Sequence, residues 1–102
     1  MGGINLVIAE ISVIPLGSGA SVSKFVKAAL KTIKSSKVKF IVGPMSTTIE
    51  TDSIDELFEV IKKAHESAFE MGSKRVVTSI KIDDRRDRNS SIQRKLNSII
   101  DY

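Results

Sequence analysis

Polar side chains recur on alternate positions of three strand-like segments of this 102-residue chain. Because successive side chains of a β-strand point to opposite faces of a sheet, polar residues two positions apart share one face. Carboxylates, hydroxyls and an ammonium group gathered on one face could meet water, a second sheet or a small polar ligand. The candidate ligand-binding residues are Glu10, Ser12, Ser46, Thr48, Glu50, Ser79 and Lys81.

The segment 74–88, KRVVTSIKIDDRRDR, runs from an alternating strand into a dense cluster of charge. We expect this strand to border any site that the protein has, since one of its faces is polar. The charged run after it is too polar to be buried unless its members are paired. Arg85 and Arg86 could hold a phosphate group. Alternatively, the alternating signs could neutralise one another across a symmetric interface, which the equal numbers of acids and arginines favour.

Few residues of the chain suit catalysis or metal binding. There is no cysteine, which excludes disulfides and thiolate chemistry. The single histidine, His65, lies at the edge of an apolar helical stripe, where a packed, hydrogen-bonded side chain is the more common role. Without a second histidine or an acid cluster of loop-binding spacing, we predict no metal site. No nucleophile, base and orienting third group can be identified either, so we predict no enzyme activity and no cofactor.

Composition predicts one small globular domain over residues 1–102. The chain is 41% hydrophobic and 27% charged, which is enough for one core but little enough that oligomerisation would help it. Sixteen bases are interspersed with twelve acids, unlike the one-signed surface of a nucleic-acid-binding protein. The apolar run 4–16 is interrupted by Glu10, follows no basic residue and is too short to span a membrane. We therefore predict a cytoplasmic protein with neither membrane nor nucleic acid as partner.

Hydrophobic periodicity predicts the strands and helices that position the candidate residues. Pro15 is expected to end the first strand. Ser53 and Glu56 have the spacing of a capping box at the start of the second helix, and Gly72 suits its end. The predicted elements are strand 5–14, helix 21–35, strand 38–43, strand 45–51, helix 53–71 and strand 75–83.

This order, β-α-β-β-α-β, is that of an α+β, ferredoxin-like fold with a four-stranded antiparallel sheet. Right-handed crossovers place both helices on one face and leave the face with the candidate residues uncovered. The tail 89–102 adds a short helical extension, which has to lean on the uncovered face or on a neighbouring chain. Apolar residues on that face, namely Ile8, Ile14 and Val77, predict a homodimer or a homotetramer.

Four segments carry a resemblance to a known family: AEISVIPLGSGASVSKFV, the hairpin strand MSTTIE, Ala64-His65-Glu66 and, most specifically, RVVTSIKIDDRRD. In these segments, and over residues 8 to about 100, the chain resembles the small YkoF-like thiamine-binding proteins, a family long left uncharacterised. The resemblance implies a ferredoxin-like fold, a dimer or tetramer built through the sheets, and non-catalytic binding of thiamine or a related pyrimidine.

One departure from the family concerns the start of the third strand. The family usually has Met-Gly-Thr there, whereas this chain has Met45-Ser46-Thr47. The added side chain of Ser46 could narrow a pocket or contribute a hydroxyl to it.

Thiamine would suit the chemistry of the candidate residues. It offers a cationic thiazolium, an aminopyrimidine edge with donor and acceptor sites, and a hydroxyethyl group. If the resemblance holds, a carboxylate of Glu10 or Glu50 opposes the thiazolium, and the hydroxyls of Ser46 and Thr48 lie near the pyrimidine. For any single one of these residues, a solvated or interface position on the sheet remains the alternative.

Two other function classes stay open. The chain could be a regulatory or oligomerisation module, or an RNA-binding domain of the same topology. Binding of RNA by such a sheet relies on aromatic side chains on the open face. Phe40 instead shares the parity of the apolar residues Val38 and Val42, which argues against this function.

Overall fold

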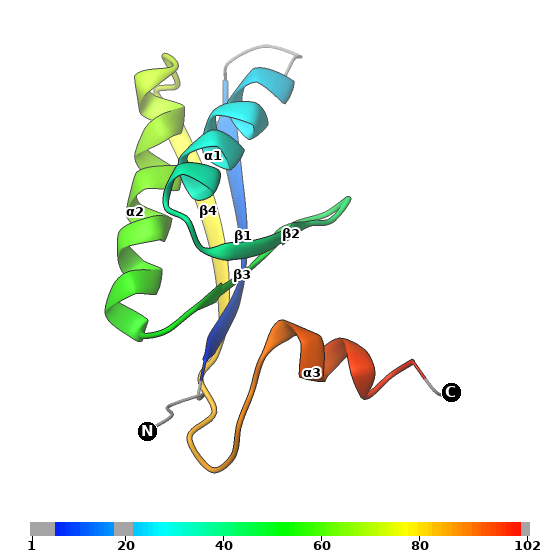
Figure 1. Ribbon diagram of the computed structural model, residues 1–102. Coiled ribbons are helices and arrows are strands. Elements are labelled where there is room, and N and C mark those ends of the chain that lie inside the picture. Colours follow the sequence, from blue (N-terminus) through cyan, green and yellow to red (C-terminus); the bar gives the residue numbers. More distant parts are fainter. Residues whose placement is uncertain (1–5, 18–21, 101–102) are drawn as a thin grey trace.

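A four-stranded antiparallel sheet forms one layer of the molecule, and two helices pack on one of its faces (Figure 1). The structure, drawn in Figure 1, is a computed structural model, and it describes residues 6–17 and 22–100. The strand order β2-β3-β1-β4 and the chain order confirm the predicted ferredoxin-like arrangement. The elements are β1 (Val7–Leu16), α1 (Ser23–Ser35), β2 (Lys39–Val42), β3 (Thr47–Thr51), α2 (Ile54–Glu70), β4 (Arg75–Asp83) and α3 (Ile92–Asn97).

The core lies between the sheet and the two helices α1 and α2. Ala9 of β1 is paired with Ile49 of β3, and both point toward the helices, where Leu57 of α2 meets them in the same cluster. Ile49 and Leu57 have no exposed surface, and burial of such a side chain contributes about 1.5–3 kcal/mol. The alternation of β1 therefore settles which sheet face is covered.

Local signals at both ends of α2 position this helix as predicted. The Ser53 hydroxyl accepts a hydrogen bond from the Glu56 amide at 3.1 Å, and a Glu56 carboxylate oxygen accepts one from the Asp52 amide at 2.9 Å. Gly72, directly after the C-cap residue Met71, has a φ of +102°, which suits a residue without a β-carbon.

The hairpin β2–β3 has shorter strands than the sequence predicted. Val42 pairs with Thr47, so residues 43–46 form the turn, and the prediction that the third strand begins at Met45 is wrong by two residues. The Gly43 amide donates to the Ser46 carbonyl at 2.9 Å. A β-carbon on Gly43 would stand 2.9 Å from that same oxygen, so the turn closes too tightly for a side chain there.

The first strand continues through Pro15, where the sequence predicted its end. It pairs with β4 over residues 8–16 but with β3 only over residues 7–11. Beyond residue 11 the strand thus has a partner on one side only, and a proline without an N–H is tolerated at such a sheet edge. The turn of the β2–β3 hairpin bends away from this unpaired end of β1 (Figure 1).

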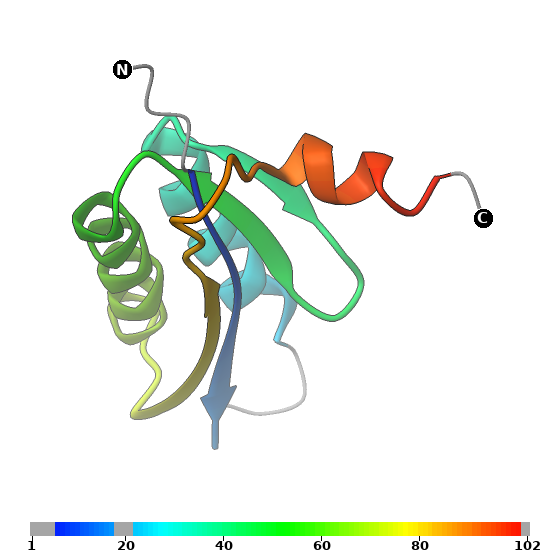
Figure 2. The ribbon, with the colours of Figure 1, turned by 90° about the horizontal axis from the view of Figure 1, so that it is seen from below.

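The tail helix α3 is tied to the uncovered side of the sheet (Figure 2). Ser91 caps it by accepting from the Arg94 amide at 3.0 Å, and Ile92 is 4% exposed. The Ile92 amide donates to the Glu50 carboxylate at 2.8 Å, and Lys95 forms an ion pair with Asp83. None of the helices within residues 6–17 and 22–100 is long and apolar enough to cross a membrane.

A candidate ligand site on the open face of the sheet

The strand register places the candidate residues on one face, opposite the helices. Glu10 of β1 stands between Thr48 of β3 and Lys81 of β4, and Ser12 stands opposite Ser79. Directly opposed residues of antiparallel strands point to the same face. We call this face, which lies opposite α1 and α2, the open face.

Ser46 joins this group from the hairpin turn, not from a strand. Its hydroxyl donates a hydrogen bond of 3.0 Å to a carboxylate oxygen of Glu10, 36 positions earlier in the chain. The Glu10 carboxylate is exposed and has further acceptor capacity beyond this one bond. The turn therefore places the Ser46 hydroxyl next to the negative charge that β1 contributes through Glu10.

Five of the seven candidate residues line one shallow hollow of about 240 Å³. This open-face hollow contains two groups of opposite charge, the Glu10 carboxylate and the Lys81 ammonium, together with three hydroxyls. Met45 and Ile80 supply apolar wall. Its lining is Glu10, Ser12, Met45, Ser46, Ser79, Ile80 and Lys81.

The other two candidates lie outside the open-face hollow. Thr48 lines a neighbouring depression that it shares with Glu10, Lys81 and Lys95, which we call the lower hollow. The Glu50 carboxylate accepts from the Ile92 amide, so it anchors α3. Sequence reasoning missed this role, since nothing along the chain indicated which acid the tail helix would meet.

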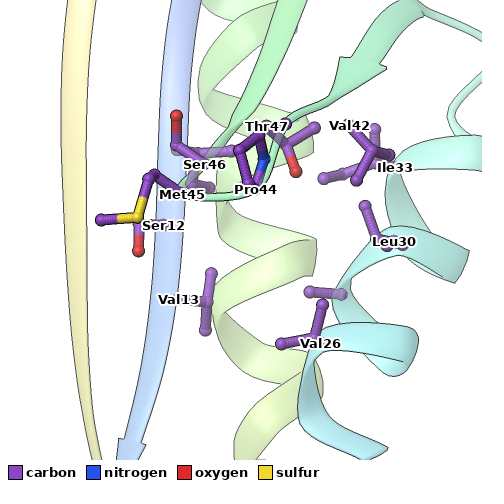
Figure 3. Close-up of a pocket in the computed structure, with 13 residues that line it drawn as sticks. Ser12, Val13, Val26, Leu30, Ile33, Val42, Pro44, Met45, Ser46 and Thr47 are labelled. Carbon is purple, nitrogen blue, oxygen red and sulfur yellow. The ribbon is translucent and has the colours of Figure 1, made fainter. Parts of the chain in front are cut away.

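A second cleft borders the same turn on the helix side, and Figure 3 shows its lining. This helix-side cleft has a volume of about 130 Å³ and lies between α1, the unpaired end of β1 and the hairpin turn. Apolar side chains such as Val13, Val26 and Leu30 face the turn across it. Ser12, Met45 and Ser46 line both this cleft and the open-face hollow.

The helix-side cleft was also missed from the sequence, because its shape depends on the hairpin turn leaving the sheet. The only local signal was the Gly43-Pro44 pair, which marks a turn without giving its direction. An apolar wall with a few placed hydroxyls is the usual composition of a small-molecule site.

Arg85 and Arg86 are engaged within their own charged run. Arg85 donates two hydrogen bonds to Asp87, at 2.6 and 3.1 Å, and Arg86 donates two to Asp84, at 3.2 and 2.8 Å. These hydrogen bonds hold the pKa of Asp84 and that of Asp87 below the usual range of a carboxyl. A phosphate group would have to compete with these carboxylates, and an interface role for the two arginines stays a prediction.

His65 has the packed role that the sequence indicated. Its Nδ1 lies 2.6 Å from the Thr78 hydroxyl of β4, and its ring meets Phe69 edge-on with the centroids 5.4 Å apart. The histidine thus joins α2 to β4 on the helix side of the sheet, away from the open-face hollow.

Comparison with known proteins gives one consistent family. A family model described as "Thiamine-binding protein" matches residues 9–100. The chain is 41% identical to a UPF0045 protein of Methanothermobacter thermautotrophicus over 92% of this chain and 96% of that one.

Solved structures agree with this match. The crystal structure of the protein MJ1052 from Methanocaldococcus jannaschii has a TM-score of 0.85 at 43% identity, with 93% of this chain and 96% of that chain covered. A Thermotoga maritima protein, provisionally assigned to thiamine biosynthesis or salvage, has a TM-score of 0.78 at 25% identity, with 91% and 97% covered.

Proposed function

Because this chain belongs to the family of thiamine-binding proteins, we propose that it binds thiamine or a related aminopyrimidine and catalyses no reaction. The observation that carries the proposal is the Glu10–Ser46 hydrogen bond. Both residues line the open-face hollow, and Ser46 also lines the helix-side cleft. A carboxylate and a hydroxyl held together there match a ligand with a cationic ring and a hydrogen-bonding ring.

In the proposed complex the Glu10 carboxylate opposes the thiazolium, and the hydroxyls of Ser46 and Thr48 lie near the pyrimidine. Lys81, opposite Glu10 on β4, places a positive charge on the same face. This positive charge would keep the thiazolium, which is also a cation, away from the β4 side of the open-face hollow.

We also propose that the open face is where chains assemble into a homodimer or a homotetramer. Ile14 of β1 and Val77 of β4 are paired neighbours on this face and are 44% and 42% exposed. Ile41 of β2, opposite Thr48, is 42% exposed. Ile8, which the sequence also places among these apolar residues, is only 4% exposed, so it adds little to such a surface. Exposed apolar side chains on one face of a small domain commonly mark a contact surface. The cytoplasmic location stays a prediction.

Binding of RNA is the weaker candidate function. Phe40 is paired with Ile49 and packs against the core, so β2 does not present it on the open face. Among the residues that the structure describes, stacking of bases would lack its usual aromatic platform there.

The test is calorimetric titration of the purified protein with thiamine, its phosphates and the free pyrimidine. Glu10→Gln keeps the side-chain shape but removes the charge, and loss of a charge-assisted contact costs about 1.5–3 kcal/mol. We therefore expect thiamine to bind about ten- to a hundred-fold more weakly.

Lys34→Gln is the matched control, since Lys34 is an exposed residue of α1 that lines neither the open-face hollow nor the helix-side cleft. It should bind thiamine as the parent does. Equal affinity of Glu10→Gln and the parent, with the assembly intact, would place the site elsewhere. Absence of binding to every ligand in the parent would leave a regulatory or oligomerisation module as the better interpretation.

A further inference from the structure

A basic hollow lies where the charged run meets α3, apart from the open-face hollow. It has a volume of about 300 Å³. Three of its side chains are cationic and three are neutral polar groups, and none of its lining residues within 6–17 and 22–100 carries a carboxylate. The lining is Arg88, Asn89, Ser90, Arg94, Lys95 and Ser98.

The arginines of this hollow differ from their neighbours in the charged run. Arg85 and Arg86 each donate two hydrogen bonds to an aspartate. Within residues 6–17 and 22–100, the guanidinium groups of Arg88 and Arg94 form no hydrogen bond and no ion pair. Two planar guanidinium forks with all their donors free are suited to an oxyanion.

Asp83 and Asp87, two acids close in sequence to Arg88, do not cancel this charge. Asp83 is paired with Lys95, and Asp87 is held by Arg85 through two hydrogen bonds, although the field of Arg88 also reaches it. The two acids are thus neutralised by other cations. Arg88 and Arg94 remain as excess positive charge.

Neutral donors complete the hollow. Ser90 is 7% exposed, and its hydroxyl has no hydrogen-bond partner in the described part of the chain. Asn89 adds a side-chain amide. The Ser98 hydroxyl already donates to the Lys95 carbonyl at 2.8 Å, so its proton is not free for a ligand.

We propose that this basic hollow binds phosphate, either as a free anion or as the phosphate group of an ester. Arg88 and Arg94 would donate to its oxygens from two sides, and Ser90 and Asn89 would donate from the floor and rim. Charge-assisted hydrogen bonds of this kind are about twice as strong as neutral ones.

The position of the hollow also specifies a class of ester. Lys95 lines both the basic hollow and the lower hollow, and Glu10 and Lys81 line both the lower and the open-face hollow. The three depressions therefore adjoin one another in series, from the Glu10 carboxylate in the open-face hollow to the two free arginines beside α3. A molecule whose cationic ring carries a phosphate ester on a short side chain matches this order of charge, and in thiamine monophosphate the hydroxyethyl group of the thiazolium carries the phosphate. This second step rests on the proposed function, whereas the phosphate site does not.

The experiment uses the whole chain with three ligands at low salt: inorganic phosphate, thiamine and thiamine monophosphate. The variant is Arg88→Gln with Arg94→Gln, which removes both charges from exposed positions. Arg86→Gln is the matched control, because it removes an arginine of the same run that is bound to Asp84. Circular dichroism checks that each protein is folded.

We expect calorimetry to show phosphate binding by the parent and by Arg86→Gln, and at least about a tenfold loss in the double variant. Binding should weaken as salt is added, since these cations are exposed. A parent that does not bind phosphate, or a folded double variant that binds it as the parent does, would overturn the proposal. Loss of binding in Arg86→Gln alone would move the site to the paired arginines.

Titration with thiamine monophosphate distinguishes a site for a free phosphate ion from a site for the phosphate group of an ester. If the parent prefers thiamine monophosphate to thiamine and the double variant has lost that preference, the hollow takes the phosphate of the ester. If inorganic phosphate binds and the ester gains nothing over thiamine, the site holds a free anion and the connection between the hollows is wrong. If thiamine does not bind at all, the proposed function fails while the phosphate result stands by itself.

Discussion

The two faces of this sheet are built from the same strands, yet their side chains meet different surroundings. On the helix side, Ile49 has no exposed surface, whereas Ile14 on the open face is 44% exposed. Both are isoleucines in antiparallel strands, so residue type does not separate them. The helices α1 and α2 cover one face only, and a small domain in which one face supplies the core can use the other for ligands and partners. Substitutions on the two faces should therefore change different measured quantities.

The strongest test of this contrast is a matched pair of truncations. Ile49→Ala should lower the free energy of unfolding by about 2–5 kcal/mol, because it leaves a cavity between the sheet and both helices. Ile14→Ala should lower it by about 1 kcal/mol or less, since much of that side chain is already exposed. Urea unfolding followed by circular dichroism measures both, and equal losses would mean that the open face also carries core.

A charge introduced on the open face tests whether this face is the interface between chains. Val77→Lys places an ammonium group among exposed apolar residues at a site that is 42% exposed in the single chain. An unpaired charge buried in an interface is strongly unfavourable, so this variant should be monomeric at micromolar concentration while each chain stays folded. Light scattering measures the mass. A parent that is already monomeric under these conditions would refute the proposed assembly.

Substitutions of Glu50 test whether this residue anchors α3 or contacts a ligand on the open face. Glu50→Ala leaves the Ile92 amide without its acceptor, at a cost of about 1–3 kcal/mol to the docking of α3. Hydrogen exchange of the Ile92 amide should accelerate by about ten- to a hundred-fold. Unchanged exchange would show that α3 is held by other contacts.

Glu50→Gln is the informative partner variant, because it keeps an oxygen acceptor for the Ile92 amide while removing the charge. Thiamine binding should fall less in Glu50→Gln than in Glu10→Gln, since one Glu50 oxygen is already occupied by the amide. A loss as large as that of Glu10→Gln, with α3 still docked, would assign Glu50 to the ligand.

The smallest expected effect is on pH dependence. Arg86 lowers the pKa of Asp84, so this contribution to stability is present above the unfolded value of about 3.9 and is lost as the pH falls through the lower folded value. Since the pair is exposed, the change in stability should be slight. An NMR titration of the Asp84 carboxyl should give a midpoint below that of a free aspartate, and Arg86→Gln should raise it. An unshifted midpoint in the parent would contradict the pairing.

The sequence by itself determined the element order, the two faces and the cap of α2. Alternation with period two is a local property, so Glu10, Ser12, Ser79 and Lys81 could be assigned to one face before any pairing was known. The Ser53 cap is equally local, because donor and acceptor are three residues apart.

The tertiary structure alone decided which of these groups meet. Ser46 reaches Glu10 because β3 pairs with β1 up to Thr47, the residue directly after Ser46. Glu50 is occupied by an amide 42 positions later. The sequence of the run 83–88 does not distinguish the paired Arg85 from the free Arg88, since the two differ only in which acid lies within reach of the guanidinium group. Hydrogen bonds and ion pairs between distant residues depend on the path of turns and on strand register, and a one-dimensional pattern does not contain those distances.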